Sequence, residues 1–257
     1  MLFDEYYLKI FEDQNRKGRW EKLRAALLCD FKTIPYTENL TKPYFMDKAS
    51  VIAARMLRLP ELGGEILDAC AAPGGKSLVI ASHLNDTRLI SNELSAERRR
   101  RLVDVLNAHL PPETRQKVTV SGFDAAALAA GRSERGRFSA VLLDAPCSSE
   151  RHVLQNQKYL NAWTPARPKF LANRQWALLS AAFLLLTTGG SLVYSTCALD
   201  PQENDGVALK LLKKYKTAVA LDPPDFAEGE KTEFGRIILP DVCDGMGPIY
   251  VSRFRVL

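Results

Sequence analysis

The chain has 257 residues, of which 46% are hydrophobic and 25% are charged, and its formal net charge is +5. This is the composition of a globular protein with a large core, and it excludes a disordered or fibrous chain. The longest apolar run, residues 177–186, is shorter than the ~18 residues of a membrane-spanning helix. The mild basic excess permits a nucleic-acid partner without requiring one.

The first 45 residues are predicted to form a short helical N-terminal extension to a main domain over residues 46–257. Apolar residues recur at helical spacing between Leu8 and Leu28, and a looser stretch containing prolines follows. Asp47 can then cap a helix over residues 48–58.

From residue 65 onward, short apolar runs alternate with amphipathic stretches. The predicted strands are 65–70, 88–92, 117–120, 138–143 and 191–195, and the predicted helices are 76–84, 96–109, 170–188 and 202–215. Two further strands, 236–240 and 248–256, have no helix between them. The pattern predicts a doubly wound α/β sheet with helices on both faces and an antiparallel addition at one edge.

The first strand runs into a loop of small residues and glycines, Asp68–Lys76 (DACAAPGGK). Ligands of open α/β sheets bind beyond the carboxyl ends of the strands, and glycines let the backbone approach them closely. A phosphate loop needs a glycine where Cys70 stands, Pro73 removes an amide donor, and the dinucleotide pattern GxGxxG is absent. S-adenosylmethionine, which carries no phosphate, needs only a tight turn and a few donors.

Acidic residues stand where the next two strands end. Glu93 follows the second strand, 18 residues after Gly75, where α/β nucleotide folds hold ribose hydroxyls. Asp124 follows the third strand, where a carboxylate can accept from an adenine amino group. Each alone is more often an exposed turn residue, but together they indicate an adenosyl pocket, and a sulfonium cation favours nearby carboxylates.

Two of the five cysteines also follow strands. Cys147 lies in DAPCSS after the fourth strand and Cys197 in STC after the fifth, so both thiols and Asp144 are expected at the same sheet edge. A thiol beside a methyl donor suits a methyl acceptor that is itself a poor nucleophile, such as carbon 5 of cytosine. A thiolate that adds to carbon 6 makes carbon 5 nucleophilic, and a carboxylate can hold the ring. No CxxC pair occurs, so no metal site is predicted.

The segments CAAPGGK (Cys70–Lys76), DAPCSSERH (Asp144–His152) and STC (Ser195–Cys197) strongly resemble the NOL1/NOP2/Sun family of RNA cytosine-5 methyltransferases. The resemblance implies a Rossmann-like class I methyltransferase domain with a seven-stranded sheet and S-adenosylmethionine as donor. It also implies that Cys197 attacks the base, while Cys147 assists release of the product. The implied cofactor contacts are Cys70, Ala71, Ala72, Pro73, Gly74, Gly75, Lys76, Glu93, Arg98, Asp124 and Asp144.

The phrases PYFMDKAS (Pro43–Ser50) and GRIILPDVCDGMGPIYVSRFR (Gly235–Arg255) look most like the branch that modifies mitochondrial small-subunit ribosomal RNA. The N-terminus lacks the basic and apolar regions of a signal peptide, and the free thiols indicate a reducing, cytosol-like compartment. A cytoplasmic location is therefore expected, and a processed mitochondrial form stays open.

Residues 151–174 contain basic and aromatic side chains but no acid. This mixture suits an RNA strand whose bases are splayed and stacked, although a solvated loop with aromatics packed on the sheet explains it almost as well. The candidate RNA contacts are Arg151, His152, Lys158, Arg167, Lys169 and Arg174.

RNA is thus the expected partner, and ribosomal RNA is favoured. No membrane or metal is expected, and an accessory RNA-binding protein is possible. Three alternatives stay open. One is a methyltransferase acting on transfer RNA, and another is a DNA cytosine-5 methyltransferase in which Cys147 attacks. The third is a non-catalytic factor that binds RNA during ribosome assembly.

Overall fold

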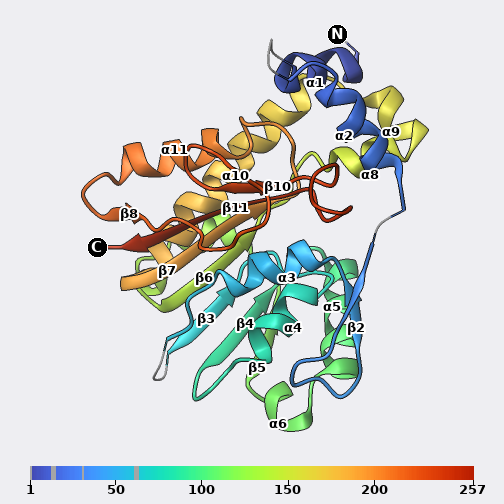
Figure 1. Ribbon diagram of the computed structural model, residues 1–257. Helices are drawn as coiled ribbons and strands as arrows, with labels where there is room; N and C mark the ends of the chain where they lie inside the picture. Colours follow the sequence, from blue (N-terminus) through green and yellow to red (C-terminus); the bar gives the residue numbers. More distant parts are fainter. Residues whose placement is uncertain (1, 13–15, 31, 61–63) are drawn as a thin grey trace.

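A twisted sheet lies at the centre of the protein (Figure 1). The computed structural model describes residues 2–12, 16–30, 32–60 and 64–257. The strands of the central sheet are β3 (Glu65–Asp68), β4 (Arg88–Asn92), β5 (Val118–Ser121), β6 (Phe138–Asp144), β7 (Leu186–Thr196), β8 (Val219–Leu221), β9 (Glu230–Lys231), β10 (Arg236–Ile238) and β11 (Ile249–Val256). The parallel part has the order β5-β4-β3-β6-β7. The antiparallel part continues as β11-β10-β9, and β8 pairs with β11.

This arrangement confirms the predicted α/β fold, a mostly parallel Rossmann-like sheet with an antiparallel C-terminal edge. The described residues contribute nine strands to it rather than seven. The two short strands β8 and β9 pair with the antiparallel edge and have too few residues to give a recognisable pattern in the sequence.

Helices cover both faces of the sheet (Figure 1). One face carries α3 (Lys48–Arg55), α4 (Gly75–Ala81) and α5 (Ala96–His109), and the other carries α7 (Ala125–Leu128), α10 (Ala166–Leu185) and α11 (Asp205–Lys214). The short helix α6 (Pro112–Arg115) and a 3-10 turn (Arg132–Glu134) lie in connections. Within the described ranges, no helix combines the length and the apolar character that crossing a membrane requires.

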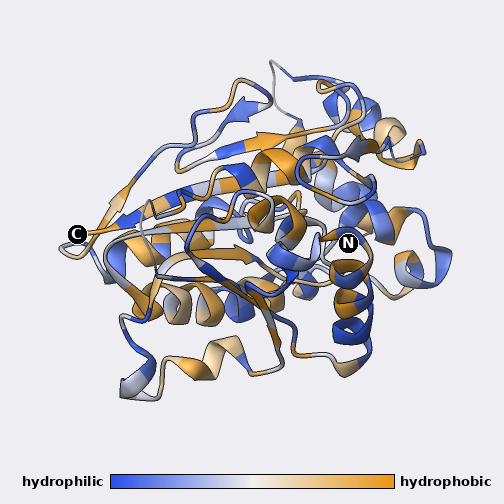
Figure 2. Cartoon of the chain, turned by 90° about the horizontal axis from the view of Figure 1, so that it is seen from below, coloured by the Kyte–Doolittle hydropathy of each residue, from blue (hydrophilic) through white to orange (hydrophobic). Residues whose placement is uncertain are grey.

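Successive residues of the central strands enter two different cores. Ile66 and Leu142 pack with α3, α4 and α5, whereas Leu67 and Leu143 pack with α10 and α11. Because both faces are covered, these strands are continuous apolar runs rather than alternating ones. Several helices in Figure 2 carry both orange and blue residues around their circumference, as amphipathic helices do.

The N-terminal helices α1 (Phe3–Phe11) and α2 (Arg19–Leu28) lie beside α8 (Glu150–Leu154) and α9 (Gln157–Ala162), which follow β6 (Figure 1). An aromatic cluster joins the four helices. The ring of Phe3 meets Trp163 edge-on at 5.0 Å between centroids, and Tyr7 stacks on Trp20 at 5.3 Å. A hairpin of β1 (Ile34–Tyr36) and β2 (Tyr44–Met46) then leads into α3.

The sequence pattern predicts no helix between Arg151 and Phe170, but the structure forms α8, α9 and the first turn of α10 there. The side chain of Asn156 caps α9 by accepting a hydrogen bond from the N–H of Lys158 at 3.1 Å. Helix α10 starts directly after Pro165, whose fixed φ suits the beginning of a helix. The prediction was wrong here because the apolar residues of α8 and α9 pack against the distant N-terminal helices.

Four predicted helix ends shift by three residues each, and one of them is the end of α4, which lies at Ala81. Helix α3 ends at Arg55, and α10 ends at Leu185 because the chain turns into β7, with Gly189 at a φ of 78°. Helix α11 begins only at Asp205. Its predicted first turn is replaced by side-chain bonding of Asn204, whose amide group accepts from a β7 hydroxyl and donates to a loop carbonyl.

Candidate active site

Three adjoining cavities lie at the carboxyl ends of the parallel strands, where α/β sheets bind ligands. The β4 cavity, about 490 Å³, lies between the end of β4 and α10. The loop cavity, about 100 Å³, is lined by residues 70–73, 75 and 76, and the cysteine cavity, about 350 Å³, is lined by Cys147 and Cys197. Cys70 lines the first two cavities, while Lys76 and Asp144 line the last two. Small-molecule sites usually measure about 300–1,000 Å³, so the larger two have that size.

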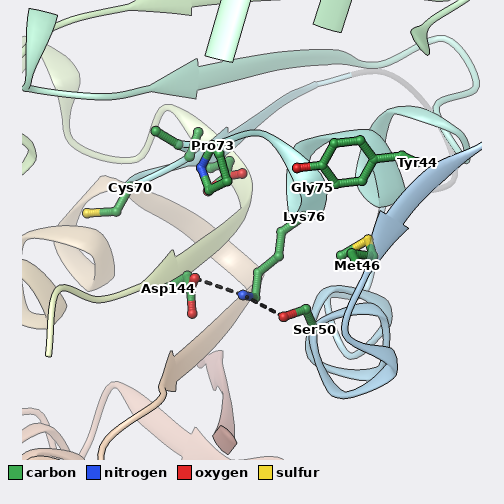
Figure 3. Close-up of a pocket in the computed structure, with 11 residues that line it drawn as sticks. Tyr44, Met46, Ser50, Cys70, Pro73, Gly75, Lys76 and Asp144 are labelled. Atoms are coloured by element: carbon green, nitrogen blue, oxygen red, sulfur yellow. Dashed lines mark hydrogen bonds and ion pairs between the residues drawn. The ribbon is translucent and has the colours of Figure 1, made fainter. Parts of the chain in front are cut away.

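The loop cavity depends on two consecutive glycines. Gly74 is the N-cap residue of α4 and has a φ of 122°, a conformation that other residues rarely adopt. A Cβ on Gly75 would lie 3.0 Å from a ring carbon of Tyr44 and 3.1 Å from the methyl group of Met46. Glycine therefore lets β2 lie over the loop, and Figure 3 shows Tyr44 and Met46 facing it across the cavity.

Lys76 and Asp144 form an ion pair between the loop cavity and the cysteine cavity (Figure 3). The Lys76 ammonium lies 2.8 Å from Asp144 Oδ2 and 3.4 Å from the hydroxyl of Ser50 on α3, while Ser195 donates to Asp144 Oδ1 at 2.8 Å. Burial lowers the pKa of Lys76, but the Asp144 carboxylate outweighs it, so that the pKa of the lysine is raised. The ammonium is therefore charged and holds Asp144 in place.

A second carboxyl, that of Asp68, is fully buried and also lines the loop cavity. It accepts a hydrogen bond from the Ser77 hydroxyl at 2.6 Å. Burial, assisted by the nearby Asp144 charge, raises the pKa of Asp68 to about 7. Asp68 and Ser50 were not among the predicted site residues, although Asp68 ends a parallel strand in the same way as the carboxylates that were predicted.

The β4 cavity brings together the acidic residues expected to bind an adenosyl group. Glu93 is buried, accepts from the N–H of Ser95 at 2.9 Å, and lies 3.1 Å from the Arg98 guanidinium. Arg98 also donates to the carbonyl of Ala72 at 2.8 Å, which joins the end of β4 to the glycine loop. Asp124 is exposed at the cavity and caps α7 with one of its oxygens.

The two predicted thiols meet in the cysteine cavity. The sulfur atoms of Cys147 and Cys197 are 2.9 Å apart, and the Ser149 hydroxyl lies 3.3 Å from Cys197 Sγ. Hydrogen bonds from Cys147 and Ser149 hold the pKa of Cys197 below its usual range, although burial opposes them. The same hydrogen bond, together with burial, raises the pKa of Cys147. Cys197 is therefore the more acidic thiol and Cys147 the one that keeps its proton.

Two buried acids, Glu150 and Glu203, stabilise the loops that carry Cys147 and Cys197. Glu150 accepts from Tyr7 of α1 at 2.5 Å, from the Ser148 hydroxyl, and from the N–H of Leu199 at 3.1 Å. Glu203 accepts from the N–H of Ser148 at 3.0 Å. Burial raises the pKa of both carboxyls, and the neighbouring Glu150 charge helps to bring that of Glu203 to about 8. These acids connect the Cys147 loop with the Cys197 loop and with α1.

The expected RNA contacts fall into different environments. Arg151 lines the cysteine cavity, but it is buried and donates to the carbonyl oxygens of Gly247 and Cys29 at 2.9 and 3.3 Å. Arg151 therefore supports the wall of the cysteine cavity, and its role as an RNA contact stays a prediction. Arg174 is exposed and lines the β4 cavity beside Phe170. His152, Lys158, Arg167 and Lys169 are exposed.

Within the described residues, no group of histidine, cysteine, aspartate and glutamate side chains is arranged to hold a metal ion.

Trp163, one of the aromatic residues between the basic ones, is only 8% exposed because it packs in the cluster with α1 and α2. Its ring is therefore unavailable for stacking on a base.

A family model described as 16S rRNA methyltransferase RsmB/F matches residues 55–255. The ribosomal RNA small subunit methyltransferase F of Erwinia tasmaniensis is 35% identical over 241 residues, which are 88% of this chain and 48% of that protein. The enzyme of the same name from Serratia proteamaculans is 34% identical over 226 residues, covering 85% of this chain and 46% of that protein. The chain thus spans about half the length of the curated relatives it matches.

Solved structures agree with this relationship. NSun6 from Pyrococcus horikoshii, determined with SFG, has a TM-score of 0.68 and 25% identity over 85% of this chain and 54% of that one. A methyltransferase homologue from the same organism has a TM-score of 0.64 and 27% identity over 86% of this chain and 70% of that one. The predicted likeness to a mitochondrial branch stays a prediction. With its fold and with the family match over residues 55–255, the chain belongs to the RsmB/F, or Sun, family of 16S rRNA methyltransferases.

Proposed function

We propose that the protein transfers a methyl group from S-adenosylmethionine to carbon 5 of a cytosine in RNA, and that the RNA is ribosomal. The observation that carries this proposal is the pair of thiols, 2.9 Å apart, in a cavity shared with Asp144. A methyl donor alone requires no thiol, whereas carbon 5 of cytosine requires a nucleophile to activate it. The ribosomal substrate is favoured by the names of the relatives.

S-adenosylmethionine is the cofactor of this methyltransferase fold, and the residues present fit it. The β4 cavity offers Glu93 for ribose hydroxyls and Asp124 for an adenine amino group. Residues 70–76, which end with Lys76, would hold the methionine end of S-adenosylmethionine in the loop cavity. A side chain at Gly75 would leave no space for β2 to lie over this loop. The carboxylates around these cavities suit a sulfonium cation.

Bound S-adenosylmethionine supplies an electrophilic methyl group. Cys197 supplies the nucleophile: its thiolate forms a bond to carbon 6 of the cytosine, which makes carbon 5 nucleophilic toward that methyl group. After the transfer, the proton on carbon 5 leaves to a base, the carbon–sulfur bond breaks, and the electron pair returns to Cys197. The lowered pKa of Cys197 supports its role as the attacking group.

Cys147 and Asp144 have different tasks in this scheme. Cys147 holds a proton beside the attacking sulfur and assists release of the methylated base. Asp144, oriented by Lys76 and Ser195, accepts a hydrogen bond from the exocyclic amine of the cytosine and so holds the ring in place for the attack.

The test uses the full chain, labelled S-adenosylmethionine and small-subunit ribosomal RNA, and it measures 5-methylcytosine after digestion to nucleosides. Cys197→Ala should form neither product nor covalent adduct, whereas Cys147→Ala should accumulate protein covalently attached to RNA. Cys29→Ala is the matched control, because the Cys29 side chain is exposed and lies outside the three cavities.

Two results would overturn parts of the proposal. If the wild-type protein forms no 5-methylcytosine in any cellular RNA, the proposed reaction is wrong. If the adduct accumulates with Cys197→Ala instead of Cys147→Ala, the two thiols have the opposite roles.

A further inference from the structure

His152 and Tyr159 form a pair of exposed rings at the edge of the cysteine cavity. Their ring centroids are 5.0 Å apart, with an angle of 43° between the ring planes. His152 lines the same cavity as Cys147 and Cys197, and Tyr159 is 46% exposed. The two rings therefore lead from the cavity wall out onto the surface of α9.

The opposite sides of these two helices are fixed in the core. Val153 and Leu154 of α8, and Trp163 at the end of α9, are buried in the aromatic cluster with α1 and α2. The helices cannot turn without removing these side chains from that cluster. The exposed rings thus stand on a rigid base.

The surface around the rings carries positive charge. Lys158 precedes Tyr159 and is exposed, Arg167 and Lys169 are exposed at the start of α10, and residues 151–174 contain no acid. Exposed aromatic rings among basic residues are the usual means of binding single-stranded nucleic acid, because every base has a face that can stack.

The chemistry proposed above creates a need for such a surface. A cytosine must leave its stack before a thiol at the base of a cavity can reach carbon 6, and its neighbour in the strand then loses a stacking partner. The exposed rings are close to this thiol cavity, since His152 lines it.

We propose that the rings of His152 and Tyr159 form a stacking site for a nucleobase adjacent to the target cytosine. This inference rests on the proposed function. Stacking accepts any base, so the site holds the strand in register without selecting the sequence.

The first experiment measures initial rates on an RNA fragment in which the wild-type protein forms 5-methylcytosine. Tyr159→Leu keeps an apolar side chain but removes the ring, and it should raise the KM for RNA about 5- to 100-fold, the range found for loss of base stacking. The kcat at saturating RNA should change much less. Tyr159→Phe is the matched control that retains the ring, and His152→Leu tests the second ring independently.

The second experiment replaces the nucleotide on either side of the target cytosine with an abasic one. Removal of the stacked base should weaken binding to the wild-type protein and should weaken binding to Tyr159→Leu by at most about twofold, since interacting groups give non-additive losses. Indifference of the wild-type protein to both abasic RNAs refutes the stacking site, even if the variants do not fold.

Equal increases of KM in Tyr159→Phe and Tyr159→Leu would also refute it, as would KM values within twofold of the wild type for both leucine variants. These results leave the proposed function intact because the wild-type protein is active. An inactive wild-type protein overturns the proposed function itself, and this inference with it.

Discussion

The hydrogen bond between Tyr7 and Glu150 connects the first helix of the chain to the active-site loops. The Tyr7 hydroxyl donates to Glu150 Oε1 at 2.5 Å, and both side chains are completely buried. The other oxygen of Glu150 accepts from the N–H of Leu199, two residues after Cys197. Tyr7→Phe removes one hydroxyl from this junction and keeps the ring in the aromatic cluster.

The expected loss depends on the charge of Glu150. A hydrogen bond to a charged group contributes about 1.5–3 kcal/mol to the free energy of unfolding, whereas one between neutral groups contributes about 0.5–1.5 kcal/mol. Burial raises the pKa of Glu150, and the hydrogen bonds from Ser148 and Tyr7 partly oppose this rise. Because the Tyr7 hydroxyl favours the carboxylate, its contribution is present at high pH and decreases as the pH falls and Glu150 is protonated.

The assay is urea unfolding of wild type and Tyr7→Phe at pH 6 and pH 9, with the larger loss of stability expected at the higher pH. Tyr6→Phe is the matched control on the same helix. Tyr6 is half-buried and donates to Asp200 at 2.6 Å, so this variant loses a hydrogen bond to a carboxylate by the same substitution but leaves the hydrogen bonds of Glu150 unchanged. A loss in Tyr7→Phe that does not change with pH, or that changes with pH in the same way as the loss in Tyr6→Phe, would refute the reasoning.

Two further predictions concern Glu203 and Glu93. Since burial raises the pKa of Glu203 from 4.5 to about 8, its contribution to stability is complete below pH 4.5 and is lost as the pH rises toward 8, by at most about 1.4 kcal/mol per pH unit. Unfolding of Glu203→Gln should therefore depend less steeply on pH, and an unchanged dependence would contradict the raised pKa. Glu93→Gln removes the charge that would hold the ribose hydroxyls, so calorimetry should show binding of S-adenosylmethionine weakened about 10- to 100-fold. A dissociation constant within twofold of that of the wild type would place the ribose elsewhere.

The parallel part of the sheet is predictable from the sequence because its signals are local. Ser95 caps α5 by accepting from the N–H of Arg98, and the structure begins and ends this helix at the predicted residues, Ala96–His109. The loop after β3 is equally local, since its glycines are needed by the backbone of that loop itself. The proximity of Cys147 and Cys197 is predictable as well, because each follows one of two strands that pair in parallel, and no side-chain contact has to be known in advance.

What the sequence could not predict depends on contacts between distant segments. Trp163 has the pattern of an exposed aromatic between basic residues, and only the N-terminal helices, more than 130 residues earlier in the sequence, explain its burial. Arg151 is bonded to carbonyl groups of Cys29 and Gly247, which lie 122 and 96 residues away. Glu150 and Glu203 look like ordinary surface acids until the fold closes the two cysteine loops over them.

The contact between the two thiols suggests why the proposed reaction uses a pair of them. While Cys197 is a thiolate, it accepts the hydrogen bond from Cys147, and this bond is the main cause of the raised pKa of Cys147. When Cys197 bonds to carbon 6 of the base, its negative charge disappears, and with it the main reason for Cys147 to retain its proton. The pKa of Cys147 therefore falls only after the adduct has formed. Once its own proton has passed to water, the Cys147 thiolate can accept the proton that carbon 5 must lose. A single thiol could not do both. After the attack its sulfur is bonded to carbon 6 of the cytosine, so it can no longer gain or lose a proton at that later stage.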